Sequence, residues 1–174
     1  MTHLAQHLAR WMAIALLATL PGAAAAQPSP GTAADDEVAT LRVALQPLFD
    51  GGQTSLDRRE ERWVLTVRTE TLFESGKDVW TAEGRDLAAE MARALAALPR
   101  TTWSVTGHTD SSGSSAFNER LSGLRAEQMR QSMIAEGIKK KRVEAAGIGE
   151  AAPVAANTSA EGRAANRRLE ISWE

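Results

Sequence analysis

The sequence has no cysteine among its 174 residues. Disulfides, thiolate zinc sites and cysteine nucleophiles are therefore excluded. Histidine is also scarce, because His3 and His7 lie in a segment that we predict to be removed, which leaves His108. A single histidine leaves almost nothing for a histidine-based metal or triad site, and we predict no metal and no other cofactor.

The sequence also has no large excess of positive or negative charge. Lys and Arg number 20 against 22 Asp and Glu, a formal net charge of −2. Proteins that hold nucleic acid usually carry a basic surface, so we expect no nucleic-acid partner. Aromatic residues are few, at 5%, yet the hydrophobic fraction of 43% and the charged fraction of 24% are typical of a globular chain. The length suits one domain and a small extra segment.

Long apolar runs are absent too. The run Trp11–Leu20 has about ten residues, whereas a membrane-spanning helix needs roughly 20. Arg10 precedes the run, and Pro21-Gly22 and the alanines 23–26 follow it. This order is typical of a secretory signal peptide with a cut after Ala26. We therefore predict a signal peptide over residues 1–26 and an exported chain of net charge −3, with an uncleaved membrane anchor as the alternative.

Residues 27–61 are predicted to form an N-terminal lead, a short helix and a charged connector. The stretch 27–34 contains two prolines and reads as flexible. After Asp35 and Asp36, apolar residues recur at helical spacing. Residues 57–62 (DRREER) are most simply a solvated connector. The apolar helical positions are Val38, Leu41, Leu45 and Leu48.

The rest of the chain alternates strands and helices. Alternating patterns predict strands over residues 63–68, 102–108, 143–146 and 169–173. Helical patterns cover about 81–98, with Thr81 as a cap, and 115–136, closed by Gly137. This order predicts an α/β or α+β sandwich with helices over one face of a sheet.

The helix predicted over 115–136 carries an arginine in its apolar face. Arg125 lies in the middle of the arc that contains Leu121 and Met129. An unpaired buried guanidinium is costly, so Arg125 needs a carboxylate, and Asp110 is the nearest candidate. Asp110 lies in a loop before the helix N-terminus, where free N–H groups favour anions. Two readings stay open: the two residues pair and brace the loop, or they bind the opposite ends of an amino-acid zwitterion.

These residues carry a resemblance to a known family. The stretch 107–113 (GHTDSSG), followed by Asn118, Leu121-Ser122 and Arg125-Ala126, resembles the signature GHTDxxGxxxxNxxLSxxRA of the OmpA-like peptidoglycan-binding domain. The resemblance covers about residues 62–174. Further matches are Leu72-Phe73, Gly137-Ile138, Gly147-Ile148-Gly149-Glu150, Pro153, Asn157, Gly162-Arg163 and Asn166-Arg167-Arg168.

The resemblance implies an α+β domain of β-α-β-α-β-β order, with helices packed on one mixed four-stranded sheet. Such a domain binds the peptide stem of peptidoglycan and does not cleave it. In the family's diaminopimelate type, Asp110 would take the ammonium of meso-diaminopimelate and Arg125 its carboxylate. The same pocket would include Thr109, Asn118, Leu121, Phe73, Gly76 and Arg168.

The resemblance also implies a location and partners. We expect a periplasmic protein associated with the cell wall or outer membrane. Residues 35–61 lie outside the resemblance and either pack on the domain or dock an outer-membrane or envelope partner. An uncleaved N-terminal segment would instead make the chain a membrane-anchored envelope or stator-like subunit. A wall hydrolase would need a metal site or a second acid fixed near Asp110, and nothing in the sequence indicates either.

Overall fold

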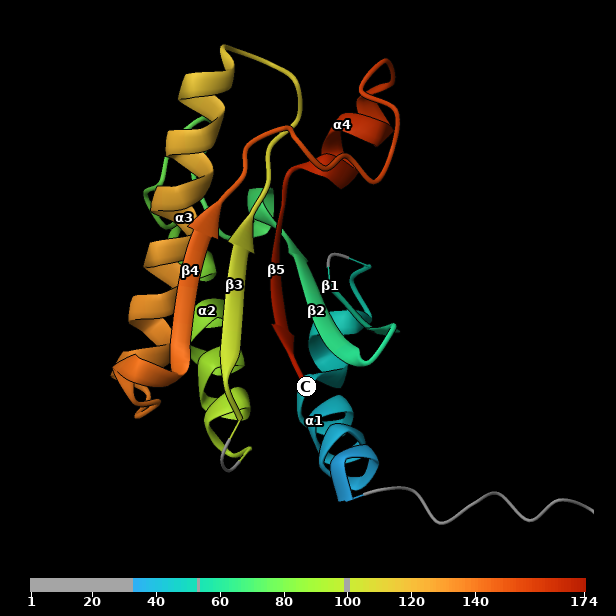
Figure 1. Ribbon diagram of the computed structural model, residues 1–174, viewed down its shortest axis with the longest axis vertical. Coiled ribbons are helices and arrows are strands. Elements are labelled where there is room, and N and C mark those ends of the chain that lie inside the picture. Colours follow the sequence, from blue (N-terminus) through green and yellow to red (C-terminus); the bar gives the residue numbers. More distant parts are fainter. Residues whose placement is uncertain (1–32, 53, 99–100) are drawn as a thin grey trace, which may run out of the picture. The chain divides into compact units, whose positions relative to one another are not determined.

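The computed structural model describes residues 33–52, 54–98 and 101–174 (Figure 1). The predicted signal peptide, residues 1–26, and the proline-containing lead before Ala33 lie outside the described residues. Residues 32–174 make up one compact unit. Within the described ranges, every helix is too short or too polar to cross a bilayer.

Helices and strands follow the predicted order. The four expected strands and the helices expected over 81–98 and 115–136 begin and end within two residues of their predicted bounds, and a helix also contains the apolar positions predicted after Asp36. The elements are α1 (Ala33–Phe49), β1 (Thr54–Arg59), β2 (Arg62–Arg68), the 3-10 turn η1 (Thr69–Thr71), α2 (Ala82–Ala96), β3 (Trp103–Gly107), α3 (Ser115–Ala135), the 3-10 turn η2 (Lys140–Arg142), β4 (Val143–Gly147), α4 (Ala160–Asn166) and β5 (Arg168–Trp173).

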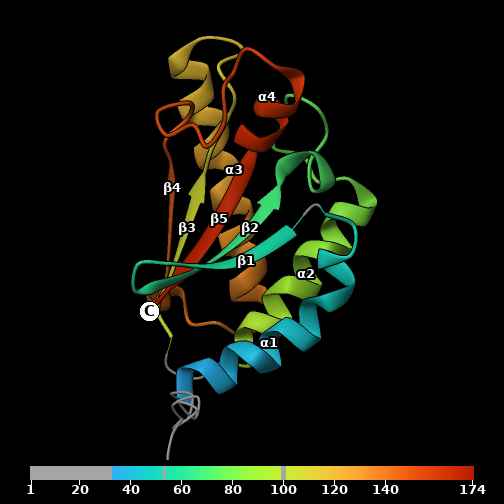
Figure 2. The ribbon, with the colours of Figure 1, turned by 90° about the vertical axis from the view of Figure 1, so that its right-hand side faces the viewer.

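The strands form one mixed sheet in the order β1-β2-β5-β3-β4 (Figure 2). Only the pair β3 and β4 is parallel, and α3 makes the crossover between these two strands. The C-terminal strand β5 lies between β2 and β3, with Ile171 opposite both Leu65 and Val105. The α+β class predicted from the sequence is therefore confirmed.

The prediction of four strands is wrong by one strand. Residues 57–62, expected to be a solvated connector, instead supply the end of β1, a two-residue turn and the start of β2. In β1, Leu56 is buried opposite Leu65, while Asp57 points to the other face. Charged side chains are a common protection of an edge strand, and here they concealed its two-residue alternation.

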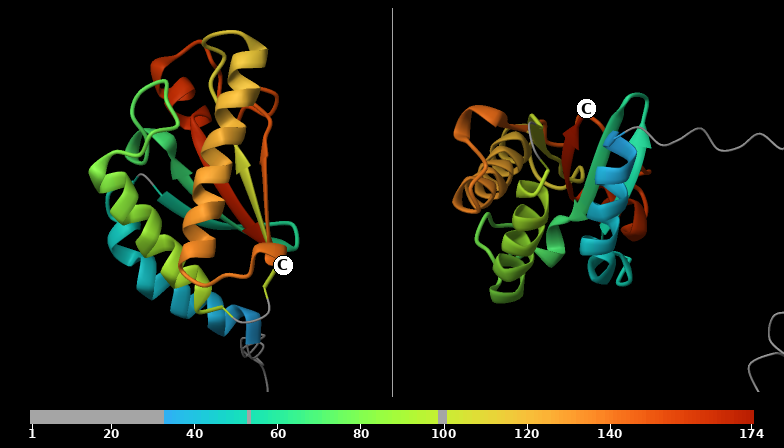
Figure 3. Two further views of the ribbon diagram at one scale, coloured as in Figure 1. Left: turned by 90° about the vertical axis from the view of Figure 1, so that its left-hand side faces the viewer. Right: turned by 90° about the horizontal axis from the view of Figure 1, so that it is seen from below.

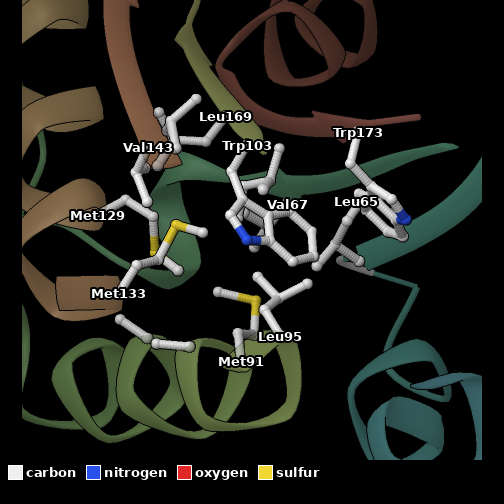
Figure 4. Packing of buried hydrophobic residues seen from close by; sticks show 14 of the residues in the cluster. Leu65, Val67, Met91, Leu95, Trp103, Met129, Met133, Val143, Leu169 and Trp173 are labelled. Atoms are coloured by element: carbon white, nitrogen blue, oxygen red, sulfur yellow. The ribbon is translucent and has the colours of Figure 1, made fainter. Parts of the chain in front are cut away.

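A single core lies between the sheet and the three long helices, which cover one face of it (Figure 3). Trp103 and Trp173 meet in this core with ring centroids 4.9 Å apart, beside methionines of α2 and α3 (Figure 4). From α1, Leu41 and Leu45 are buried in the same cluster. Residues 35–61 were expected either to pack on the domain or to dock a partner. The structure shows that this segment packs on the domain.

Backbones approach closely where α3 crosses β4. A Cβ on Gly147 would lie 2.0 Å from the backbone nitrogen of Gly123, so position 147 requires glycine. Near this crossing, the hydroxyl of Ser122 accepts a hydrogen bond from Gly149 N at 3.0 Å, and Thr109 N donates to the carbonyl of Gly149 at 2.9 Å. These contacts hold the loops after β3 and β4 against the N-terminal half of α3.

Candidate functional site

A cleft of about 440 Å³ opens at the C-terminal end of β3. Its walls come from η1, the segment between η1 and α2, the loop after β3, the N-terminal half of α3 and Arg167 between α4 and β5. Almost every site residue predicted from the sequence lines this cleft, and the exception is Arg168. The lining includes Phe73, Gly76, Thr109, Asp110, Asn118, Leu121 and Arg125.

Arg125 is a buried cation without a carboxylate partner among the described residues. Its side chain lies on the inner face of α3, and the residue is 4% exposed. Its Nε donates to the carbonyl oxygen of Lys77 at 2.8 Å and its Nη1 to Thr69 Oγ1 at 3.3 Å. The guanidinium lies 5.3 Å from the centre of the Phe73 ring. Burial lowers the pKa of Arg125 from its usual high value, yet a guanidinium in a protein stays protonated.

Asp110 is an ionised carboxylate that is fixed in direction. Its Oδ1 accepts from Ser112 N at 2.8 Å, the geometry of an Asx turn, and its Oδ2 accepts from Arg167 Nη1 at 2.7 Å. Burial on its own raises the pKa of Asp110. The hydrogen bonds from Arg167 and Ser112 outweigh this effect and hold the pKa below its ordinary value.

Asp110 and Arg125 do not form an ion pair. Arg125 donates to a hydroxyl and a backbone carbonyl, while Asp110 takes Arg167 as its partner. The reading in which Asp110 and Arg125 brace the loop by pairing is therefore wrong, and the expectation that Arg125 needs Asp110 as its direct partner is wrong with it. Both side chains nevertheless line the same cleft, one as its anion and one as its cation.

Arg168 was expected near the pocket, and the structure places Arg167 there instead. Arg167 lies in the cleft and joins Asp110 to Glu70, whose Oε2 it meets at 2.8 Å. The hydrogen bond to Glu70 is the main cause that raises the pKa of Arg167. Arg168 is buried elsewhere, with Nε 2.8 Å from Glu170 Oε1 and Nη2 3.1 Å from the carbonyl oxygen of Ala152.

The alternation of β5 explains this one-residue error. Leu169, Ile171 and Trp173 face the core and the helices, so Arg167 shares their side of the chain and Arg168 has the opposite side. The pattern was present in the sequence and could have separated the two arginines.

The remaining walls combine fixed and free groups. Asn118 donates from Nδ2 to the carbonyl oxygen of Asp110 at 3.2 Å and also to Glu150, so it ties α3 to two loops. Thr109 Oγ1 is buried and has no hydrogen-bond partner among the described residues. Phe73 stacks on Trp80 with ring centroids 4.3 Å apart, which fixes the opposite wall.

Several lining residues were not found from the sequence. They include Thr69 and Glu70, which belong to a short 3-10 turn with no hydrophobic periodicity. The carbonyl of Lys77, which accepts a hydrogen bond from Arg125, was not found either, because any residue type would supply it. The others are Glu74, Ser75, Ser112 and Phe117.

The arrangement suits a ligand that carries both charges. Arg125 has no carboxylate partner among the described residues, and the carboxylates of Asp110 and Glu70 line the same cleft. Charge-assisted hydrogen bonds to a carboxylate and to an ammonium are the strong contacts that such a cleft can make. In the described part of the chain, no group of histidine, aspartate or glutamate side chains is arranged to hold a metal ion.

The model of the OmpA family matches residues 72–167, more than half of the chain. The chain belongs to the OmpA family. The match includes every residue of the cleft from Phe73 to Arg167 but not Thr69 and Glu70.

Relatives of this OmpA family chain differ in how much of their length it spans. It is 30% identical over 168 residues to the outer-membrane lipoprotein YfiB of Pseudomonas aeruginosa, covering 95% of this chain and 94% of the relative. It is 35% identical over 86 residues to the peptidoglycan-binding protein ArfA of Mycobacterium tuberculosis, covering 49% of this chain and 26% of the relative. Against several other curated relatives, it spans 58% or less of the relative's length.

A solved structure has the same fold. The cell wall anchor of the T6SS from Pseudomonas aeruginosa superposes with a TM-score of 0.69 at 31% sequence identity. The superposition covers 76% of this chain and 95% of the anchor. The OmpA-like architecture predicted from the sequence is therefore confirmed, with the additional strand β1.

Proposed function

We propose that this protein binds peptidoglycan without cleaving it, by taking the free end of the meso-diaminopimelate side chain into the cleft. The observation that carries this proposal is the buried guanidinium of Arg125, which has no carboxylate partner among the described residues. The names of two similar proteins, a peptidoglycan-binding protein and a cell wall anchor, support binding to the cell wall.

The free end of diaminopimelate is an amino-acid zwitterion, and each pole has a counterpart. Arg125 is already desolvated in the free protein, so a ligand carboxylate supplies the missing opposite charge. Nη2 of Arg125 has no acceptor within the described ranges, which leaves donors for that carboxylate. Asp110 can accept from an ammonium with the lone pairs that Arg167 and Ser112 leave free.

Binding without hydrolysis agrees with the electrostatics of Asp110. A general acid for glycoside or peptide cleavage needs a carboxyl group whose pKa is raised toward neutrality. Arg167 and Ser112 instead lower the pKa of Asp110, so the group is an ionised acceptor. We therefore assign Asp110 to ligand binding.

The export signal remains part of the proposal. A cut after Ala26 would release a periplasmic chain that begins at Gln27 and holds to the wall through the cleft. The alternative is an anchored subunit that retains residues 1–26. Sequencing the N-terminus of the exported protein separates them, because a first residue at Gln27 excludes the anchored form.

The ligand assignment is tested by titration with two muropeptides, one containing diaminopimelate and one containing lysine at the same position. Lysine lacks the second carboxylate, so Arg125 would be left without its partner. We expect the lysine muropeptide to bind about 10- to 100-fold more weakly, which is the strength of a hydrogen bond to a charged group. Isothermal titration calorimetry on the exported form measures both affinities.

Two variants test which residue binds the ammonium of the ligand and which binds its carboxylate. We expect Asp110→Asn and Arg125→Lys each to lose at least about tenfold in affinity for the diaminopimelate muropeptide. Asp86→Asn and Arg85→Gln, at exposed positions of α2, are the matched controls and should bind normally. Thermal unfolding verifies that all four proteins are folded. Equal affinity for the two muropeptides, or normal binding by both site variants, would refute the assigned site.

A further inference from the structure

A second hollow, of about 290 Å³, adjoins the cleft. Gly76, Phe117 and Leu121 line both, so the two hollows lie side by side. The second hollow lies between residues 76–79 and the outer side of α3. Its remaining walls are Lys77, Asp78, Val79, Arg120 and Leu124.

Exposed apolar side chains gather in this hollow. Val79 is 49% exposed, Phe117 50% and Leu124 40%. Phe117 and Leu124 are seven residues apart, which places them on one side of α3 two turns from each other. The core cluster does not contain these three side chains. An apolar surface that the fold does not use and that borders a ligand cleft fits a small aliphatic group of the ligand.

The charges of the hollow favour an anion on one side. Arg120 is exposed, and no ion pair or hydrogen bond of its side chain occurs within the described part of the chain. Lys77 is different, because its Nζ is paired with Glu74 at 2.7 Å. Asp78 is the carboxylate of this lining, and its charge partly opposes the lowering of the pKa of Arg125 by burial. Arg120 is therefore the cation that remains available to a carboxylate.

Resting on the proposed function, we propose that this hollow binds the D-alanine that follows diaminopimelate in the stem peptide. The alanine methyl group contacts Val79, Phe117 and Leu124, and the terminal carboxylate meets Arg120. The alanine joins the backbone carboxyl group of diaminopimelate, at the other end of the short side chain whose free end occupies the cleft. It therefore lies beside the cleft, within reach of a hollow that shares walls with it. The protein thus prefers stem peptides that retain this alanine.

Tetrapeptide and tripeptide muropeptides, both with diaminopimelate, test the proposal on the exported protein. Burial of one methyl group gives about a fourfold gain, and an exposed ion pair gives about a two- to fivefold gain. We therefore expect the tetrapeptide to bind roughly tenfold more tightly than the tripeptide. A tetrapeptide that ends in a carboxamide should bind about threefold more weakly than the acid, and this difference should vanish in Arg120→Gln.

Leu124→Ser tests the apolar part and should reduce the preference for the tetrapeptide about threefold. Val154→Ser is the matched control, because Val154 is also exposed, at 54%, and lies outside the hollow. Equal affinity for tetrapeptide and tripeptide, with discrimination against the lysine muropeptide intact, would overturn this inference and leave the proposed function standing. Loss of the lysine discrimination would remove the proposed function and this inference together.

Discussion

At the scale of single residues, His108 follows β3 and occupies an uncommon position. It is 3% exposed, and neither ring nitrogen has a hydrogen-bond partner among the described residues. Its Nε2 lies 3.8 Å from Glu170 Oε2, and Glu170 is already bound by Arg59 and Arg168. Burial lowers the pKa of His108 to about 4, and Arg168 adds to this effect while Glu170 opposes it. The imidazole is therefore neutral in the folded protein at neutral pH.

Stability should consequently depend on pH through His108. An unfolded histidine takes up a proton near pH 6.5, whereas the folded one does so near pH 4. Above pH 6.5, neither state binds this proton and the group has no effect. As the pH falls from 6.5 to 4, the unfolded state alone gains a proton, and we expect a loss of about 2–3 kcal/mol in the free energy of unfolding.

The control for this prediction is His108→Gln, which cannot titrate. Urea unfolding of both proteins at several pH values between 4 and 7 should give a flatter profile for the variant. The lowered pKa values of Asp110 and Glu170 add stability that is lost as the pH falls through the ordinary carboxyl range and below. These carboxyl groups therefore act at the acid end of the window in both proteins, and the effect of His108 is the difference between the two profiles. Parallel profiles in the two proteins would contradict the assignment.

The sequence reveals some of these residue-scale features and hides others. Arg125 could be found because it interrupts an apolar helix face, and Asp110 because it lies in the loop that begins that helix. The partners of Arg125 could not be found, since one is a backbone carbonyl and the other is Thr69, in a turn without a pattern. The residue types in the sequence indicate which charged groups the site contains. They do not indicate which of these groups contact each other.

At the scale of elements, two segments were not predicted, for different physical reasons. In β1, the charged residues 57–59 hide a strand whose only fully apolar inward residue is Leu56. In α4, the buried residues are Gly162 and Asn166. Asn166 accepts from Val154 N at 2.8 Å and donates to the carbonyl oxygen of Ala155 at 2.9 Å. A helix held by a polar side chain has no hydrophobic periodicity to detect.

The hairpin between β1 and β2 makes a prediction at this scale. Arg59 in β1 lies opposite Arg62 in β2 in the backbone register, so Glu60 and Glu61 form a two-residue turn. Glu60 has a φ of 56°, and it is the one non-glycine residue with positive φ in the described ranges. A positive φ at the first central position is the pattern of a type II′ turn, which favours glycine there. We therefore expect Glu60→Gly to stabilise the protein by about 1 kcal/mol.

Glu61→Gly is the matched comparison for the hairpin. Glu61 has the same charge and exposure class, but its φ is negative. Glycine at position 61 gains no relief from strain and loses conformational entropy on folding, so we expect a neutral or destabilising effect of about 0.5 kcal/mol. Chemical denaturation of the two variants beside the parent measures both values. A destabilised Glu60→Gly would show that the turn does not store strain.

At the scale of the whole molecule, the folding unit and the family match have different limits. The family model begins at residue 72, and the resemblance seen in the sequence begins near residue 62. The compact unit begins at Thr32, because α1 and β1 contribute to the same core as the rest of the chain. Their buried apolar side chains are Val38, Leu41, Leu45 and Leu56. A domain boundary drawn from motifs alone therefore cuts through the core.

Two truncations test this boundary. A chain of residues 32–174 should unfold in one cooperative transition, because it retains the complete unit. A chain of residues 62–174 loses the buried apolar side chains described in α1 and β1, Val38, Leu41, Leu45 and Leu56, and leaves β2 as an unprotected edge strand. At about 1.5–3 kcal/mol for each side chain, the loss is comparable to the whole stability of a typical domain, about 5–15 kcal/mol. We expect the shorter chain to aggregate or to show no cooperative transition by circular dichroism. If both chains unfold cooperatively and their unfolding midpoints differ by only a few degrees, the domain folds without α1 and β1.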